Sequence, residues 1–444
     1  MDRRDFLRTG LALGGAALAT TTAPGCATAA AAVTPDAAPP AAAPPTADSW
    51  EALRAEFDLT HDEVHLSNFL LAPHPRCVRE SIEVYRRAFD TNPVKALKQY
   101  YPQADLEVAQ AIARYLEVKP EEIGLTESTT VGLGLVYSGL RLSEGEEILT
   151  STHEHYSTDK SLLLRAERTG ARVRRIPLYT EPESVTEEGL VRAVMDALTP
   201  RTRYLAMTWV HSGSGVKLPL RALSEALVRV NAGRGEAERV LLCVDGVHGL
   251  GAEAESVASL GCDFFMAGCH KWMFGPRGTG FVWGRTAAWG RVVPSVPTFF
   301  SPTVRMWAQD IPTQQVAPGP QIAPGGFHAF DHRWSMGKAF ELHERLGRAR
   351  VAERVHALNR QAKEGLAAMK HVRVRTPLAD ALSSGITCFE VAGHTPAEVV
   401  HHLGDKGIVA SVSPYVTKYV RLAPGVLNTP ADVDAALREI RALG

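Results

Sequence analysis

Short apolar runs alternate with longer amphipathic stretches along residues 121–285. The apolar runs have the length and flanks of buried strands, and they lie at residues 123–125, 147–150, 173–177, 204–207, 240–244 and 264–267. The intervening stretches that read as helices lie at residues 131–140, 160–170 and 220–231. This alternation predicts an α/β fold with a mostly parallel central sheet, right-handed crossovers and helices on both faces. A GxGxxG motif is absent, which argues against a dinucleotide-binding fold.

The flanking regions complete the predicted organisation. Residues 49–57, 79–89 and 106–116 read as helices, the last with an apolar face of Leu106, Ala109, Ile112 and Leu116. We place an N-terminal segment and a large domain at residues 49–330, and a bridging helix with a smaller α+β C-terminal domain at residues 331–444. Residues 295–329 are rich in Pro and Gly, and a loop of this length is usually functional or interfacial.

Composition narrows the class of protein. The 444 residues suffice for two domains with full cores, and 45% hydrophobic with 22% charged residues is ordinary for a soluble globular protein. The net charge is −1 with no basic block beyond the N-terminus, so neither nucleic acid nor an anionic membrane surface is an expected partner. The six cysteines show no zinc spacing, and His153 and His155 lack a third ligand at motif spacing, so we predict no metal site.

The N-terminus has the pattern of a targeting segment. Arg3-Arg4-Asp5-Phe6-Leu7-Arg8 and the weakly hydrophobic run behind it resemble a twin-arginine (Tat) signal, which exports folded proteins. We assign residues 1–29 to this signal and the Ala/Pro-rich residues 30–48 to a linker. The hydrophobic run is too short for a transmembrane helix. We therefore expect a periplasmic or extracellular protein, with lipidation of Cys26 as an alternative to cleavage and a disordered tail with a chance Arg pair as the other interpretation.

A carboxylate and a lysine follow two neighbouring strand candidates. Asp245 ends the run at residues 240–244, and His270 and Lys271 follow the run at residues 264–267. Open α/β sheets bind ligands at such strand ends. A lysine amine can hold an aldehyde as a Schiff base, and a carboxylate can keep a pyridine nitrogen protonated, which are the two needs of pyridoxal 5'-phosphate (PLP) enzymes. A turn aspartate and a surface lysine are the alternative interpretation.

A family resemblance supports the chemical interpretation. Asp245-Gly246-Val247-His248, then Gly268-Cys269-His270-Lys271-Trp272 and the loop Gly275-Pro276-Arg277-Gly278-Thr279-Gly280, resembles the class V (cysteine desulfurase-type) aminotransferase family. The surroundings look closest to its isopenicillin N epimerase-like branch, over about Val64 to the C-terminus. The resemblance implies the type I fold of PLP-dependent transferases and a homodimer. It also implies PLP on Lys271, Asp245 at the pyridine nitrogen and His248 near the phenolic oxygen, with His270 among the cofactor-binding residues.

Further cofactor contacts follow from the same resemblance. Ser128, Thr129 and Thr130 open a helix, where hydroxyls, free N–H groups and the helix dipole suit a phosphate; plain N-capping is the alternative. The family holds the PLP phosphate at this point in the chain. His155 matches a histidine that stacks on the pyridine ring, and Ser212 stands where desulfurases usually place an Asn near the phenolic oxygen.

Two residues are candidates for substrate binding. Arg421 matches the family's carboxylate-binding arginine, and a guanidinium can hold a carboxylate by two parallel hydrogen bonds. Asn68 lies in the entry segment that lines the active site in the family, although a turn residue there needs no further explanation. The family's Gly-Thr contact to the partner's phosphate is absent, since Gly326 is followed by Phe327.

The expected reaction is chemistry at the α-carbon of a small amino-acid-like substrate. Lys271 is the acid/base, and the branch resemblance favours an epimerase or racemase; an aminotransferase and a C–S β-lyase are the alternatives. Desulfurases need a mobile cysteine before the carboxylate-binding arginine, and residues 409–417 contain none, which argues against a persulfide mechanism. A cofactor-free exported binding protein on the same fold is the alternative of another class.

Overall fold

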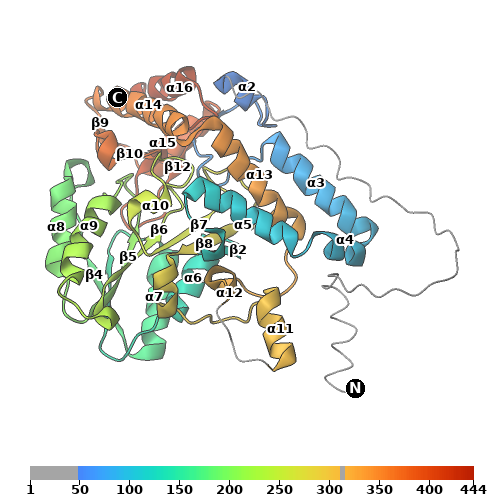
Figure 1. Cartoon of the computed structure of the whole chain (residues 1–444). Helices are drawn as coiled ribbons and strands as arrows, with labels where there is room; N and C mark the ends of the chain where they lie inside the picture. The colour runs from blue at the N-terminus through green and yellow to red at the C-terminus, as the bar shows by residue number, and fades with distance from the viewer. Residues whose placement is uncertain (1–48, 311–315) are drawn as a thin grey trace, which may run out of the picture.

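A seven-stranded sheet forms the centre of the molecule (Figure 1). The computed structural model describes residues 49–310 and 316–444. The strand order is β2-β8-β7-β6-β5-β3-β4, and the strands are β2 (Ile123–Thr126), β3 (Glu147–Ser151), β4 (Arg172–Ile176), β5 (Thr202–Thr208), β6 (Leu241–Asp245), β7 (Phe264–Gly268) and β8 (Gly280–Gly284). Strand β8 runs antiparallel to both of its neighbours, β2 and β7, and the other neighbouring pairs in this sheet are parallel. The predicted fold class is confirmed.

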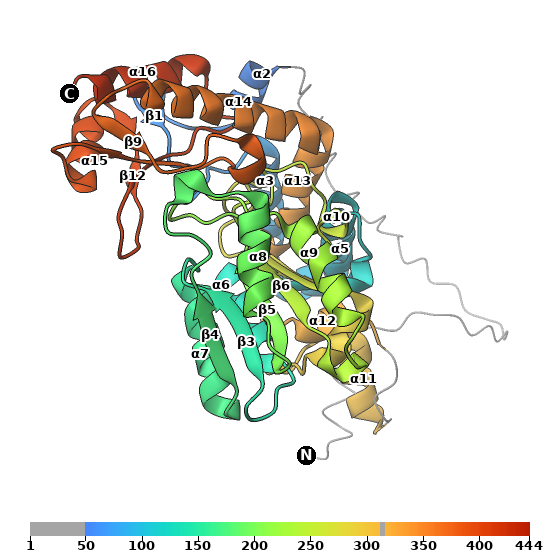
Figure 2. The ribbon, with the colours of Figure 1, turned by 90° about the vertical axis from the view of Figure 1, so that its left-hand side faces the viewer.

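Both faces of the sheet are covered by helices, as Figure 2 shows for the strands β3 to β6. Alternate residues along β7 enter opposite cores, with Phe265 in one and Phe264 in the other. The first core is covered by α5 (Gln103–Leu116), α8 (Glu187–Ala197), α9 (Leu220–Asn231) and α10 (Val257–Leu260), and the second by α6 (Thr129–Gly139) and α7 (Tyr156–Thr169). The predicted inner face of α5 was partly wrong: Leu106 is 46% exposed, and Val108 takes a place in the core instead.

The helices of the N-terminal segment pack with a long helix from later in the chain. The N-terminal helices are α2 (Trp50–Arg54), α3 (Arg76–Thr91) and α4 (Pro93–Tyr100), and the long helix is α13 (Phe330–Leu346). Helix α13 lies against both α3 and α5, which Figure 1 shows in orange beside blue and teal. Aromatic rings on α3, α4 and α13 meet where Trp334 contacts Tyr85, Phe89 and Tyr100. Helices α3 and α4 are thereby fixed to the helix that leads into the C-terminal part.

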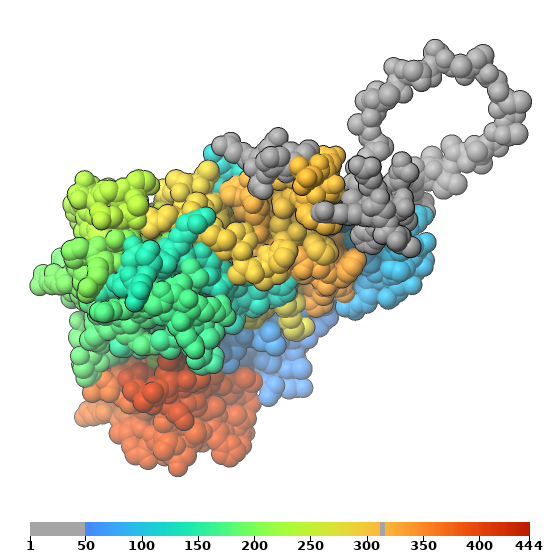
Figure 3. Space-filling model, turned by 90° about the horizontal axis from the view of Figure 1, so that it is seen from below, coloured from blue at the N-terminus to red at the C-terminus, as the bar shows by residue number. Residues whose placement is uncertain are grey.

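The C-terminal residues form a second layer at one end of the molecule, seen in orange and red in Figure 3. Its antiparallel sheet has the order β12-β13-β10-β9, with β9 (Val372–Val374), β10 (Thr387–Val391), β12 (Ser411–Val412) and β13 (Val420–Leu422), and its helices are α14 (Arg348–Ala367), α15 (Pro396–Asp405) and α16 (Pro430–Arg441). Strand β1 (Val64–His65) pairs with β11 (Ile408–Val409), so the N-terminal segment joins this layer. The domain division at residues 330/331 remains a prediction.

The Pro- and Gly-rich residues 295–329 are not a structureless loop. They include α11 (Ser301–Gln309) and α12 (Pro318–Ile322), and α12 packs against β2. A Cβ added at Gly319 would lie 2.3 Å from the backbone nitrogen of Ile123, so this close approach requires glycine. Local composition indicated a loop because it does not report such tertiary packing.

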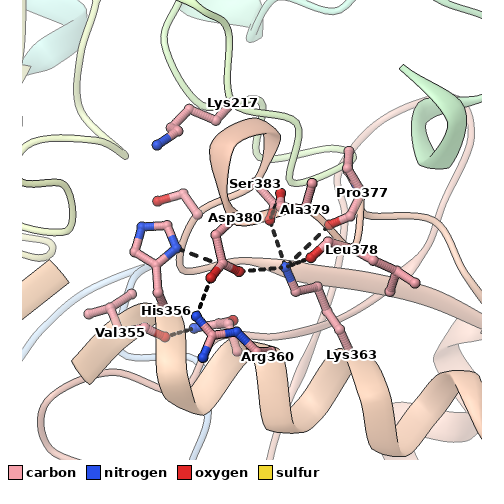
Figure 4. Close-up of polar contacts among 12 residues, drawn as sticks. Lys217, Val355, His356, Arg360, Lys363, Pro377, Leu378, Ala379, Asp380 and Ser383 are labelled. Atoms are coloured by element: carbon pink, nitrogen blue, oxygen red, sulfur yellow. Dashed lines mark hydrogen bonds and ion pairs between the residues drawn. The ribbon is translucent and has the colours of Figure 1, made fainter. Parts of the chain in front are cut away.

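A buried polar network holds residues 377–383 to α14 within the C-terminal layer (Figure 4). Lys363 of α14 donates to the Ser383 hydroxyl at 2.7 Å and to the Leu378 carbonyl at 2.8 Å, and it pairs with Asp380 at 3.4 Å. In the same region Glu253, which follows β6, binds the Lys217 amine at 2.7 Å. The segment from Pro377 to Ser383 is therefore anchored to α14 by side-chain contacts rather than by a sheet.

The described residues bear on membrane crossing but include no part of the predicted export signal. Within residues 49–310 and 316–444, no helix is long and apolar enough to cross a membrane. The predicted signal at residues 1–29, the linker at 30–48 and Cys26 lie outside the described residues.

Candidate active site

Most of the predicted site residues lie where the parallel strands end. Ser128 follows β2, His155 follows β3, Ser212 follows β5, and Asp245 and Lys271 belong to the ends of β6 and β7. Strand β8 begins at the same edge, because Gly280 pairs with Thr126 on one side and with Gly268 on the other. The carboxyl edge of one sheet therefore gathers side chains that are far apart in the sequence.

The turn after β6 places Asp245 and His248 beside Lys271. The Val247 amide donates to the Asp245 carboxylate at 3.2 Å, and the Thr158 hydroxyl of α7 donates to it at 3.5 Å. The amine of Lys271 lies 3.0 Å from His248 Nε2, while His248 Nδ1 is buried without a hydrogen-bond partner in the described structure. A Cβ at Gly246 would overlap the Phe265 ring at 1.9 Å, so this turn requires glycine.

Burial sets the protonation of these groups. It raises the pKa of Asp245 to about 6, against the lowering influence of the Val247 hydrogen bond and the Lys271 charge. Burial also lowers the pKa of Lys271 to about 8, although the Asp245 carboxylate acts to raise it. The pKa of His248 is held well below its usual value by burial first and by the Lys271 charge second. The site therefore holds one carboxylate, one readily deprotonated amine and a neutral imidazole.

The predicted phosphate cup is formed by the start of α6. Ser128 is the N-cap and accepts a hydrogen bond from the Val131 amide at 3.1 Å, as the capping interpretation expects. Thr129 Oγ1 accepts from the Gly268 amide at 2.8 Å, and Thr130 Oγ1 lies 2.9 Å from the Ser157 hydroxyl. The N–H groups of a first helical turn have no partners within the helix, and its dipole favours an anion. The two interpretations of this cluster are thus compatible.

His270 adjoins this cup from the end of β7. An added Cβ at Gly268 would lie 2.9 Å from both the Thr129 hydroxyl and the His270 ring, so the three residues are neighbours. Burial, followed by the Lys271 charge, lowers the pKa of His270 to about 4. The role of His270 as a cofactor-binding residue stays a prediction.

His155 caps α7 and faces the site. Its Nδ1 accepts a hydrogen bond from the Ser157 amide at 3.2 Å, which assigns the remaining proton of the neutral ring to Nε2. Burial lowers the pKa of His155, with the charges of Lys271 and Arg421 adding to the effect. A neutral, fixed ring at this position suits stacking on an aromatic cofactor.

Arg421 is buried in the middle of the C-terminal sheet rather than at its edge. Only 3% of the residue is exposed, and its guanidinium donates to the Ser212 carbonyl at 3.1 Å and to the Val412 carbonyl at 3.0 Å. The guanidinium also lies over the Phe69 ring, 4.9 Å from its centre. None of the described acidic side chains forms an ion pair with it, and its Nε has no partner there. A buried cation without a carboxylate is a ready site for one.

Asn68 reaches the same place from the N-terminal segment. It lines a small pocket together with Lys271 and Trp272, and its amide nitrogen is buried without a described partner. An unpaired buried donor beside the lysine is consistent with the predicted contact to substrate. The structure thus brings all the predicted residues to one region.

Tyr415 is a site residue that the sequence did not indicate. It lies in the turn between β12 and β13, and its hydroxyl is 2.8 Å from Ser212 Oγ. Its ring meets His155 edge-on, with centroids 6.4 Å apart. Ser212 and Tyr415 are 203 residues apart, so no local spacing relates them. The small residue at Gly213 was the one available signal, because a Cβ there would lie 2.9 Å from the Tyr415 ring.

The region of the missing Gly-Thr has a different arrangement. Gly326 has φ +131°, and Phe327 is 83% exposed. The next residue, His328, pairs with Glu127 at 2.9 Å, directly before the phosphate-cup residues. Within the described ranges, no group of three or more His, Cys, Asp or Glu side chains is arranged to hold a metal ion.

Known proteins resemble this chain over most of its length. The family model for aminotransferase class-V matches residues 71–435. The isopenicillin N epimerase of Streptomyces clavuligerus is 25% identical over 359 residues, covering 78% of this chain and 86% of the relative. A cysteine desulfurase of Klebsiella pneumoniae subsp. pneumoniae is 27% identical over 427 residues, covering 89% and 99%.

Solved structures resemble the fold. A mutant of the cystine C–S lyase C-DES, with glycine covalently linked to its PLP cofactor, superposes with a TM-score of 0.78 at 20% identity, covering 88% of this chain and 99% of the other. An apo cysteine desulfurase from Thermococcus onnurineus NA1 superposes with a TM-score of 0.75 at 21% identity, covering 88% and 97%. At these identities the likeness concerns the fold.

Proposed function

Because this chain belongs to the class-V aminotransferase family and is a PLP-dependent enzyme, we propose that it is an epimerase or racemase. Its substrate would be an amino acid or an amino-acid-containing peptide. The observation that carries the proposal is that the partly buried Lys271 and the buried Asp245, at the carboxyl edge of the seven-stranded sheet, lie close to the buried Arg421 of the C-terminal sheet, beside a hairpin that has no thiol. The enzymatic family sets aside the cofactor-free binding protein as an alternative.

The residues at the sheet edge fit the cofactor. Asp245 is a buried carboxylate that would face the ring nitrogen, and the start of α6 is an anion site for the phosphate. His248 keeps a buried, unpartnered ring nitrogen, and Lys271 is the nearby amine. When bound, PLP supplies a conjugated ring that draws electrons from the α-carbon of an attached amino acid.

The protein side chains then divide the remaining tasks. Arg421 binds the substrate carboxylate, since it is a buried guanidinium without an acidic partner. Lys271 takes or returns the α-proton, because its pKa of about 8 leaves an appreciable neutral fraction near pH 7. Asp245, with a pKa of about 6, remains mostly ionised at that pH and favours a protonated ring nitrogen.

A persulfide mechanism has little support in this chain. Desulfurases need a cysteine before the arginine, and the hairpin between β12 and β13 has none before Arg421. The thiol beside Arg421 is Cys388, which pairs with it across the sheet. Burial raises the pKa of Cys388 to about 12, so this thiol stays protonated. Transamination and β-elimination remain as the competing reactions.

The test follows the α-proton and the configuration together. Purified protein loaded with PLP is incubated in ²H₂O with isopenicillin N and with the L and D forms of the standard amino acids. Proton NMR then reports exchange, chiral chromatography reports inversion, and keto acid assays report the competing reactions. Inversion without keto acid supports the proposal. Keto acid as the main product, or no exchange with any probe, contradicts it. The Lys271→Ala variant is the control, and its visible absorption band should be shifted from that of the wild type.

Export is a separate part of the proposal. We propose that residues 1–29 direct the folded enzyme out of the cytoplasm by the Tat route. In a Tat-competent bacterium, the full chain should reach the periplasmic or extracellular fraction, and a variant with Arg3→Lys and Arg4→Lys should stay in the cytoplasm. Equal distribution of both would contradict the proposal. The homodimer also remains a prediction, which light scattering of the purified enzyme measures.

A further inference from the structure

Tyr415 lies at the tip of the β12–β13 hairpin, with its side chain directed inward. The next residue, Val416, is fully exposed, whereas the Tyr415 ring packs on Gly213 and its hydroxyl bonds to Ser212. Gly213 and Ser212 both follow β5. The ring of Tyr415 also meets His155, which follows β3, edge-on. The hairpin thus inserts one phenol between two strand ends of the other sheet.

Tyr415 and Lys271 reach the site from different sides. The Lys271 amine follows β7 and contacts His248, which follows β6. The Tyr415 phenol contacts Ser212 and His155, which follow β5 and β3, and the two groups share no hydrogen bond. Strands β7 and β6 lie on one side of β5, and β3 lies on the other. Along the sheet edge, the Lys271 amine therefore lies on the β7 and β6 side of the site, and the Tyr415 phenol lies on the β5 and β3 side.

The two groups differ in the proton they hold near neutral pH. Burial raises the pKa of Tyr415 to about 12, so the phenol is protonated and can act as a donor. The hydrogen bond with Ser212 opposes this rise, as does the Arg421 charge, and both would stabilise a transient phenolate. Lys271, in contrast, is readily deprotonated and can act as the acceptor. A base and an acid are the pair that inversion at one carbon needs.

We infer that Tyr415 is the second proton-transfer residue of the reaction, acting on the α-carbon from the side opposite Lys271. This inference rests on the proposed epimerase function. In one direction the α C–H bond breaks and its proton passes to the Lys271 amine, while a bound cofactor would hold the electron pair. The Tyr415 O–H bond then breaks and its proton forms the new C–H bond with that electron pair. The phenolate regains a proton from solvent, and the Lys271 ammonium releases its proton to solvent. The reverse direction exchanges the two roles.

The test separates inversion from proton exchange. Tyr415→Phe removes one oxygen and keeps the ring on Gly213. Tyr419→Phe is the matched control, because Tyr419 lies in the same hairpin with its ring against Arg375 and away from Ser212. Each PLP-loaded variant is incubated in ²H₂O with isopenicillin N, and with L- and D-alanine beside it. The visible absorption band of the cofactor is recorded as a readout that does not depend on turnover.

The expected result is that Tyr415→Phe changes the rate of inversion much more than the rate of α-proton exchange. Tyr415→Phe should keep the cofactor band and should exchange the α-proton of one epimer within about threefold of the wild type. Its inversion rate should fall by about 100-fold or more, the range of a lost general acid. Inversion at the wild-type rate would overturn the inference, and so would an equal loss of exchange from both epimers with a raised KM, which indicates a positioning role.

The controls distinguish the two proposals. Tyr419→Phe should match the wild type in every measurement. If the wild type exchanges α-protons but forms keto acid instead of the other epimer, the proposed epimerase function fails, and the role of Tyr415 fails with it. If the wild type inverts its substrate and Tyr415→Phe does so equally well, only the role of Tyr415 fails.

Discussion

Lys363 offers a sharp test of how residues 377–383, which contact the loop after β5, are held in place. Its side chain is 2% exposed, and its amine contacts two backbone carbonyls, the Ser383 hydroxyl and the Asp380 carboxylate (Figure 4). The segment it anchors continues into contacts with the loop after β5, where the Lys217 amide donates to the Leu382 carbonyl at 2.9 Å. Lys363→Met removes the charge and the donors while it keeps the length of the side chain.

The expected loss in the free energy of unfolding depends on which groups Lys363→Met leaves without a partner. Hydrogen bonds from a charged group contribute about 1.5–3 kcal/mol each in favourable cases, but burial lowers the pKa of Lys363, so its charge is costly to bury and part of that gain is offset. Asp380 keeps its ion pair with Arg360 and is not left as an isolated charge. We therefore expect a loss of about 2–3 kcal/mol in the free energy of unfolding, below the 3–5 kcal/mol typical when a buried charge loses its only partner.

Urea unfolding followed by far-UV circular dichroism measures this loss. Lys338→Met is the matched control, since Lys338 is 39% exposed and pairs with Glu341 at 3.0 Å on the surface of α13. It should cost less than about 0.5 kcal/mol. Agreement of the m-values between variants checks that the same transition is compared. The reasoning is refuted if Lys363→Met costs no more than Lys338→Met.

Three further predictions concern the site. Arg421→Lys should raise KM about 10- to 100-fold with a smaller change in kcat, because a single ammonium replaces a guanidinium that can bind a carboxylate by two bonds; steady-state kinetics on the substrate that the proposed assay identifies would check this. Asp245→Asn should lower kcat/KM by about 100-fold, the effect of losing one charge-assisted hydrogen bond, with the cofactor still bound in the absorption spectrum. In the protein without cofactor, Lys271 should titrate near pH 8, well below an ordinary lysine at 10.5, and its pKa should fall further in Asp245→Asn, because Asp245 acts to raise it; carbon-13 NMR of the reductively methylated protein measures both values.

The sequence predicted the elements that local pattern determines. Apolar runs bounded by turn residues predicted β5, β6 and β7 within two residues of their ends, because strands buried on both faces are nearly continuous apolar runs. Strand β8 was not predicted from the sequence, because its first residue belongs to a glycine-rich loop and its last residue is also glycine. Its pairing with β2 and β7 is long-range, and no short window of sequence reports it.

The same limit applies to the site: residues in local motifs could be predicted, and a residue placed by long-range packing could not. Asp245 and Lys271 could be singled out because each follows a strand and each belongs to a recognisable motif. Tyr415 could not, because its contacts with Ser212 and His155 depend on how a hairpin of the C-terminal sheet lies over the other sheet. The exposed position of Leu106 was missed for a related reason: the helical period identifies an apolar face, but the packing of α13 decides which residues that face includes.

The hairpin between β12 and β13 is the place where the choice of reaction would be made. Arg421 and Tyr415 both belong to it, and the Arg421 guanidinium donates to the backbone of Val412 on the neighbouring strand as well as to Ser212. A change in the position of the hairpin would therefore move the proposed carboxylate-binding group and the phenol together. Lys271 and Asp245 are attached instead to the seven-stranded sheet. On the proposed mechanism, the electron-withdrawing chemistry would depend on the sheet, and the fate of the α-carbon would depend on which side chain the hairpin presents. A phenol there favours proton return, and a thiol would be needed for attack on sulfur.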